Sequence, residues 1–269
     1  RSVTQTPTIK TNLMAINKNG TGYTFGFAIV MVVVVGAALA VTAMSLKPLQ
    51  QANAADKKMM DILGAIKVDS QRDNAKALFA EYVTSRVAIN ASGTQVSVKQ
   101  GDVNATDATD PFNIDIKKDY RSHKPAKGDL AWGNADDLNF PVFECQKEGE
   151  TYYVVPMVGS GLWGPIWGYV AMEGDMQTIY GAKFDHKTET PGLGAEIKED
   201  FFTVKFEGKT LEEVGPTYFS VLKGGAVTNE HSVDGITGGT ITSKGVDEML
   251  NRTMGIYLKY FNNEQRAQR

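Results

Sequence analysis

The residues with the clearest chemical potential lie in the segment 237–245, which reads TGGTITSKG. Threonine hydroxyls can carry a group covalently, and glycines let a phosphate lie against the backbone. The segment leads into a predicted helix, for which Thr242 or Ser243 is the expected N-cap. Free N–H groups and the helix dipole favour an anion at such a start. The segment is a candidate phosphate or anion site, and a ligand-free cap and turn is the alternative.

Two other glycine-bearing segments accompany it. Residues 159–169, GSGLWGPIWGY, lie between two predicted strands and indicate a tight irregular hairpin, in which Trp163 either fills the core or forms an aromatic wall for a planar ligand. Residues 186–197, HKTETPGLGAEI, contain a Pro-Gly turn signal, and Gly192 and Gly194 can let backbone N–H groups face a ligand. Neither a Walker loop nor a strand–GxGxxG–helix order is present.

The elements that must position these segments are predominantly β. Short runs rich in aromatic and β-branched residues predict strands at NFPVFECQ, TYYVVPMV, IWGYVAMEG, TIYGAKFDH and FFTVKFE. The closing stretch 243–263 predicts an amphipathic helix that packs on the sheet, because one face carries Val246, Met249, Leu250, Thr253, Met254, Tyr257 and Phe261. Together these elements indicate one α+β domain with a mostly antiparallel sheet and flanking helices.

A membrane anchor precedes this domain in the sequence. The run from Phe25 to Leu46 holds about 22 apolar residues, which as a helix span roughly 33 Å, enough for a hydrocarbon core of about 30 Å. A signal peptide is the competing interpretation, but its apolar core is usually only about 7–15 residues long. We therefore expect a retained transmembrane helix over 23–47, with Lys47-Pro48 closing its far edge.

The remaining divisions follow from composition. Residues 1–22 are expected to be a tail, with native translation beginning at Met14 as one possibility. Residues 48–130 are expected to form a membrane-proximal region, with helices near 56–67 and 71–83 and a polar excursion over 90–127 that holds a short strand at TQVSV. The main domain is then expected over 131–265.

Charge and residue counts exclude several classes of function. The formal net charge is −3 and no basic stripe is present, which argues against nucleic-acid binding. Cys145 is the single cysteine, so an internal disulfide is excluded and a cysteine-held cluster is disfavoured. His123, His186 and His231 are far apart, so no metal site is expected. No nucleophile–base pair suggests a self-contained active site, and no catalytic residue is assigned.

Taken together, the N-terminal span and the ordered motifs GLWGPIWGY, ETPGLGAEI and DGITGGTITS resemble the C subunit of the sodium-translocating NADH:quinone oxidoreductases. This family shares its domain with the G subunit of Rnf complexes. In the family, FMN is joined through its phosphate to a threonine of an S/T-G-A-T-x-T/S motif. The resemblance covers nearly all of residues 14–265 and makes Thr240 the attachment residue. The chain departs from the motif in having Thr237 and Gly239 where serine and alanine are commoner.

The resemblance also implies the remaining site residues. Gly238 and Gly239 would give access to the phosphate, and Thr237, Thr242 and Ser243 would supply short donors. Candidates for packing the isoalloxazine ring or holding its polar edge are Leu162, Trp163, Glu189, Thr190, Gly192, Leu193 and Gly194.

The implied function is electron relay within a bacterial inner-membrane complex, with the domain on the periplasmic side. Other subunits, one of them a second flavin-bearing membrane subunit, would oxidise NADH, reduce ubiquinone and move sodium, and a flavin transferase using FAD would install the FMN. Two alternatives stay open: the G subunit of an Rnf complex, and a membrane-anchored scaffold without a cofactor. The long segment before FPVFECQ favours the quinone oxidoreductase family over the Rnf one.

Overall fold

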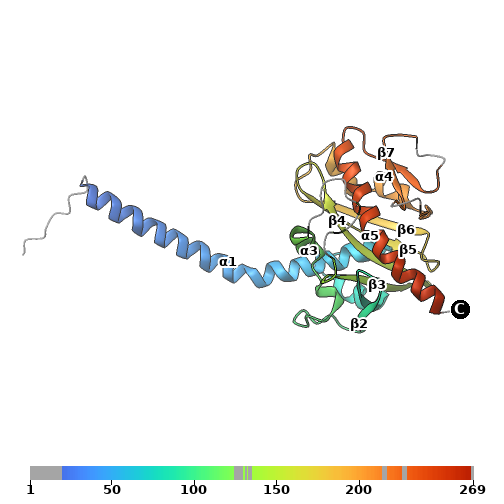
Figure 1. Cartoon of the computed structure of the whole chain (residues 1–269). Coiled ribbons are helices and arrows are strands. Elements are labelled where there is room, and N and C mark those ends of the chain that lie inside the picture. The colour runs from blue at the N-terminus through green and yellow to red at the C-terminus, as the bar shows by residue number, and fades with distance from the viewer. Residues whose placement is uncertain are drawn as a thin grey trace, which may run out of the picture. The chain divides into compact units, whose positions relative to one another are not determined.

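The computed structural model describes residues 20–123, 130, 132, 135–213, 217–225 and 229–267 (Figure 1). The expected N-terminal tail lies outside this range except for its last three residues. The chain divides into two compact units between Ala54 and Ala55. The expected boundary near residue 130 does not separate compact units, because strands on both sides of it join one sheet.

The apolar N-terminal segment forms helix α1, Thr21–Ala65. It is long and apolar enough to cross a bilayer, and the side chains of its most apolar stretch are exposed. The helix does not end at Lys47-Pro48 as expected but continues through Pro48. Proline costs an internal hydrogen bond, yet here it lies between two stretches of good helix formers that extend on both sides.

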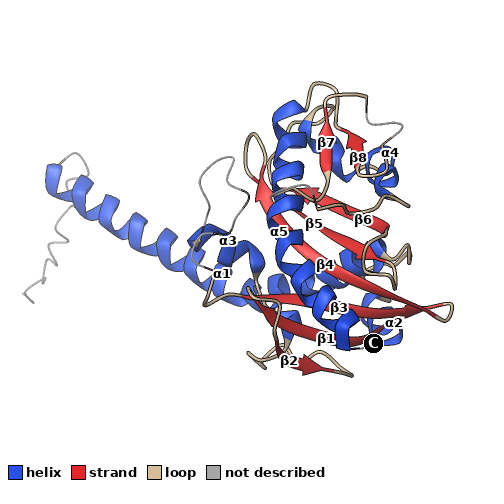
Figure 2. Ribbon diagram, turned by 45° about the vertical axis from the view of Figure 1, so that its right-hand side comes forward, coloured by secondary structure: helices blue, strands red, loops and turns tan. Residues whose placement is uncertain are grey.

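A six-stranded antiparallel sheet forms the centre of the second unit (Figure 2), in the order β2-β1-β3-β4-β5-β6. Four expected strands are confirmed as β3, β4, β5 and β6, and the short strand at TQVSV is confirmed as β2. The bounds are β1 Val83–Asn90, β2 Gln95–Lys99, β3 Asn139–Lys147, β4 Glu150–Ser160, β5 Pro165–Met172 and β6 Ile179–His186. A separate parallel pair joins β7, Ser220–Leu222, to β8, Ser232–Asp234.

Helices bury both faces of the sheet because successive strand residues point to opposite sides. Val155 belongs to the core beneath the closing helix α5, Thr240–Ala267, whereas Val154 belongs to the core beneath the end of α1 and helix α2, Ala75–Tyr82. Figure 2 shows α5 lying across its face of the sheet. The expected apolar stripe of α5 is confirmed as buried. Within this core the hydroxyl of Tyr257 lies 3.1 and 3.0 Å from the carbonyl oxygens of Pro141 and Pro156.

The stretch FFTVKFE is helical, so the strand expected there is wrong. It forms α4, Asp200–Thr203, and the 3-10 turn η3, Val204–Phe206. Phe202 and Phe206 are buried with a spacing of four, while Phe201 and Val204 are half exposed. That spacing is the helical one, and a run this short does not separate the two periods by composition. A further 3-10 turn, η2, covers Gly194–Lys198.

The polar excursion is described past β2 as far as His123, and this part contains two short helical elements. Strand β1, which the sequence did not predict, carries the buried Arg86, whose Nε and Nη2 atoms lie 2.9 Å from the two carboxylate oxygens of Asp110. Asp110 also accepts the N–H of Phe112 at the 3-10 turn η1, Pro111–Asn113. Helix α3, Ile116–Ser122, follows. The ion pair thus ties the excursion to the sheet.

We expect Asp110→Ala to destabilise the chain by about 3–5 kcal/mol, because it leaves the Arg86 guanidinium buried without its counter-charge. Urea unfolding of the full chain in detergent, followed by circular dichroism, measures the change. Lys198→Ala is the control, since it removes the cation of an exposed pair worth about 0–1 kcal/mol. Equal midpoints for the two variants would contradict the prediction.

Candidate functional site

The site is built at the first turn of α5. Thr240 is the first residue of the helix, so Thr242 and Ser243 lie inside it and neither is the N-cap that was expected. Gly238 has φ +78°, a left-handed conformation that favours glycine and turns the chain sharply into the helix. A Cβ on Gly238 would also lie 2.7 Å from Cδ2 of Leu193.

A backbone contact fixes this end of α5 against strand β4. A Cβ placed on Gly159 would lie 2.8 Å from Cβ of Met249 and 3.2 Å from the carbonyl oxygen of Gly245. A Cβ on Gly245 would in turn clash with the carbonyl oxygen of Ser160. Helix and strand therefore approach with no side chain between them at these two positions.

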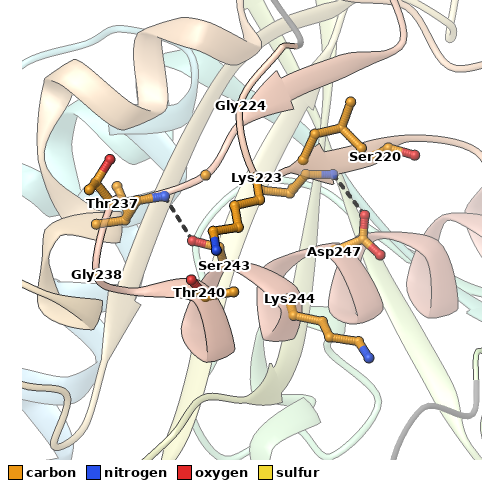
Figure 3. A pocket seen from close by; sticks show the side chains of 13 residues that line it. Ser220, Lys223, Gly224, Thr237, Gly238, Thr240, Ser243, Lys244 and Asp247 are labelled. Carbon is orange, nitrogen blue, oxygen red and sulfur yellow. Dashed lines mark hydrogen bonds between the residues drawn. The ribbon is translucent and has the colours of Figure 1, made fainter.

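A cavity of about 610 Å³ opens beside the helix start (Figure 3). It lies between β7, the loop after β8 and the first two turns of α5. The Ser243 hydroxyl accepts the N–H of Ile236 at 2.8 Å, and a carboxylate oxygen of Asp247 accepts the N–H of Val221 at 2.7 Å. These two bonds attach the cavity walls to the helix. The lining residues are Ser220, Val221, Leu222, Lys223, Gly224, Gly235, Ile236, Thr237, Gly238, Thr240, Ser243, Lys244 and Asp247.

Sequence reasoning missed several lining residues, among them two cations. Lys244 and Asp247 follow Thr240 by four and seven residues, so all three share one helical face. That spacing was a usable signal once the helix start was placed at Thr240. Lys223 comes from the end of β7, and no local pattern connects it to α5.

The four hydroxyl residues of the motif divide into two kinds. Thr242 and Ser243 are buried and already bonded: the Thr242 hydroxyl donates to Glu189, and the Ser243 hydroxyl accepts the N–H of Ile236. Thr237 and Thr240 are exposed and line the cavity. Among the described residues the Thr240 hydroxyl has no hydrogen-bond partner, so it is free to react with a group presented from outside.

The expected ring contacts lie close to the motif but do not line this cavity. Leu193 reaches Gly238 and Gly239 and is 42 % exposed. Leu162 and Trp163, in the four-residue loop between β4 and β5, are 49 % and 66 % exposed and line a second cavity of about 590 Å³ with Lys117 and Trp167. The loop is the hairpin predicted from the sequence, closed by a bond from the Gly161 N–H to the Gly164 carbonyl.

The predicted Pro-Gly turn is present after β6. Gly192 has φ +77°, and the N–H groups of Leu193 and Ala195 both donate to the carbonyl of Thr190. The Gly192 N–H donates to the carboxylate of Glu196, so it faces a protein acceptor. Gly194 is buried against Thr242 and Glu189. Glu189 also points inward, and the residue is only 5 % exposed.

Comparison with known proteins decides the family. Residues 161–255 match the model of the FMN-binding domain. The C subunit of the Na(+)-translocating NADH-quinone reductase of Pseudomonas aeruginosa is 31 % identical over 253 residues, which cover 89 % of this chain and 93 % of that protein. The C subunit from Vibrio vulnificus is 32 % identical over 88 % of this chain and 91 % of its own. This chain belongs to the same family of C subunits.

A solved structure from this family supports the same assignment. The C subunit from Parabacteroides distasonis is 35 % identical and superposes with a TM-score of 0.66, covering 80 % of this chain and 96 % of that one. The shared fold confirms the expected architecture of antiparallel sheet and flanking helices after a long apolar helix. These relatives favour the C subunit over the Rnf alternative, and α1 fits a single-pass anchor of a protein in a membrane complex.

The Ser243 bond gives a direct test of how the cavity wall is held. Ser243→Ala leaves the buried N–H of Ile236 without its acceptor, and we expect a loss of about 1–3 kcal/mol of unfolding free energy. Thr237→Ala is the matched control, because the Thr237 side chain is exposed. Chemical denaturation of the full chain in detergent compares the two, and equal stability would contradict the assigned role of the Ser243 hydroxyl.

Proposed function

We propose that this chain is an electron-carrier subunit of a Na(+)-translocating NADH:quinone reductase, with FMN attached through its phosphate to Oγ1 of Thr240. The observation that carries the proposal is the hydroxyl at the first residue of α5, which is exposed and has no hydrogen-bond partner among the described residues, within a segment that matches the FMN-binding domain. FMN supplies the redox chemistry when it is bound, and the protein holds it in place.

The residues around Thr240 suit a phosphodiester. Its negative charge would lie at a helix start, where free N–H groups and the helix dipole favour an anion. Lys223 and Lys244 line the same cavity and would offset the charge further. Gly238 keeps the approach to the hydroxyl open, because it has no side chain and its backbone turns away through a positive φ.

The apolar residues near the motif offer contacts for the ring system. Leu193, Leu162 and Trp163 are exposed, and a planar isoalloxazine would bury apolar surface against them. Gly194 and Thr190 are part of the turn that presents Leu193. These contacts are proposals, as are those of Thr237, Gly239 and Gly192.

The wider assignment follows from the family. The soluble unit would face the periplasm, and its electron partners would be other subunits of the complex, including a second flavin-bearing membrane subunit. NADH oxidation, quinone reduction and sodium movement would belong to those subunits. A separate flavin transferase would use FAD: the phosphoanhydride bond of FAD would break, the FMN phosphate would join Oγ1 of Thr240, and AMP and the hydroxyl proton would leave.

Thr240→Ala should abolish covalent flavin, because it removes the acceptor oxygen. The chain is produced together with its flavin transferase, and the measurements are flavin fluorescence on a denaturing gel and the intact mass. Peptide mass mapping around residue 240 then locates the modification.

Thr237→Ala is the matched control, since it removes the other exposed hydroxyl of the motif and should keep the fluorescent band. Thr242 is a poor control because its hydroxyl is buried and bonded. A native chain of unmodified mass would support the cofactor-free scaffold, and a fluorescent Thr240→Ala variant would move the attachment elsewhere.

A further inference from the structure

One buried carboxylate connects all three glycine-bearing motifs. Oε1 of Glu189 accepts the N–H of Trp163 at 2.8 Å, and Oε2 accepts the hydroxyl of Thr242 at 2.5 Å. The N–H groups of Leu162 and Gly164 also bond to it. Glu189 itself precedes the Pro-Gly turn. The carboxylate therefore joins the β4–β5 loop to the first turn of α5, two residues from Thr240.

Two glycines make room for this carboxylate. A Cβ on Gly161 would lie 2.6 Å from Oε1 of Glu189, and a Cβ on Gly194 would lie 2.5 Å from Oε2 and would also clash with the Thr242 hydroxyl. Real Cβ atoms essentially never approach so closely, so each position excludes a side chain while the carboxylate stays in place. Gly161 and Gly194 therefore leave space for the Glu189 side chain, whether or not a ligand is bound nearby.

Hydrogen bonds stabilise the negative charge of Glu189. Among the described residues, no lysine, arginine or histidine forms an ion pair with it. Burial alone raises the pKa of Glu189, but the bonds from Thr242 and from the N–H groups of Trp163, Leu162 and Gly164 outweigh it, and the pKa is lowered overall. The group is therefore ionised at neutral pH. Its stabilising effect is present above the ordinary glutamate pKa and is lost on acidification through the lowered value.

We propose that Glu189 is a positioning residue: its carboxylate holds the first turn of α5 so that the Thr240 hydroxyl faces outward, with the Leu162-Trp163 segment fixed beside it. It acts through Thr242 and through the loop N–H groups. The role in flavin attachment rests on the proposed function, whereas the role in holding the two segments can be measured on the protein without flavin.

The experiment uses the full chain in detergent with Glu189→Ala, Glu189→Gln, Thr242→Val and Thr242→Ser. Amide hydrogen exchange of the flavin-free protein reports on segments 161–164 and 240–245. The rate of covalent flavin incorporation, with the transferase and FAD, is measured by gel fluorescence. Glu199→Gln is the matched control, because it neutralises an exposed carboxylate on the same stretch of chain. Denaturant midpoints separate local from global effects.

We expect Glu189→Ala to speed exchange in both segments and to slow incorporation on the order of tenfold to a hundredfold, the usual scale for a misplaced reacting group. Thr242→Val should speed amide exchange mainly at 240–245. Thr242→Ser should exchange there at the rate of the unsubstituted chain, because serine keeps the hydroxyl. The double variant Glu189→Ala/Thr242→Val should incorporate flavin no more slowly than Glu189→Ala alone, since both changes remove the same bond. Glu199→Gln should match the unsubstituted chain in both amide exchange and the rate of flavin incorporation.

Unchanged exchange in both segments for Glu189→Ala would overturn the proposal, and so would slower incorporation without a change in local exchange. If Glu189→Ala unfolds globally, Glu189→Gln and Thr242→Val decide by the same two measurements. If the chain without substitutions takes up no flavin, the proposed function fails. The exchange data still decide whether Glu189 holds the two segments.

Discussion

The packing of α5 on one face of the sheet determines where the candidate attachment site lies. The helix buries an apolar stripe from Val246 to Phe261, and Tyr257 reaches backbone carbonyls of two strands in the middle of that interface. These contacts fix the axis of the helix. Thr240 therefore projects from a packed element, and the loops around it are arranged with respect to that element.

Charge is divided across this helix start in a way that suits a bound phosphate. Lys223 and Lys244 lie on the cavity side, where an anion would be placed. The anion of Glu189 is buried on the side of the β4–β5 loop and is stabilised by hydrogen bonds from that loop and from Thr242. A carboxylate that already has its donors repels an incoming anion less than an unsatisfied one would.

The sequence predicted the elements whose signals are local. The long apolar run of α1, the aromatic and β-branched runs of β3–β6 and the helical apolar stripe of α5 are each readable over their own length. FFTVKFE was misassigned because its two buried phenylalanines are too few to establish a period. Strand β1 was missed because Arg86 interrupts its apolar pattern, and the partner that allows its burial is 24 residues away.

The same limit applies to the site. Thr240 was identified because a motif of contiguous residues carries it, and the motif match remains the reason to assign it. Lys223 could not be found, since it comes beside α5 only when the β7 segment bonds to that helix in the folded chain, as Val221 does to Asp247. The inward orientation of Glu189 was equally out of reach. Its partners, Trp163 and Thr242, lie 26 and 53 residues away, so their bonds exist only in the folded chain.

The close contact between Gly159 and Gly245 limits which substitutions this chain can tolerate. A methyl group at either position would clash with the facing element and push the start of α5 away from β4, while the middle of the helix stays packed on the sheet. Thr240 lies further from the packed middle of the helix than Gly245 does. A small displacement at Gly245 would therefore become a larger one at the Thr240 hydroxyl. Damaging substitutions are thus expected at Gly159 and Gly245, although neither residue lines the cavity beside Thr240.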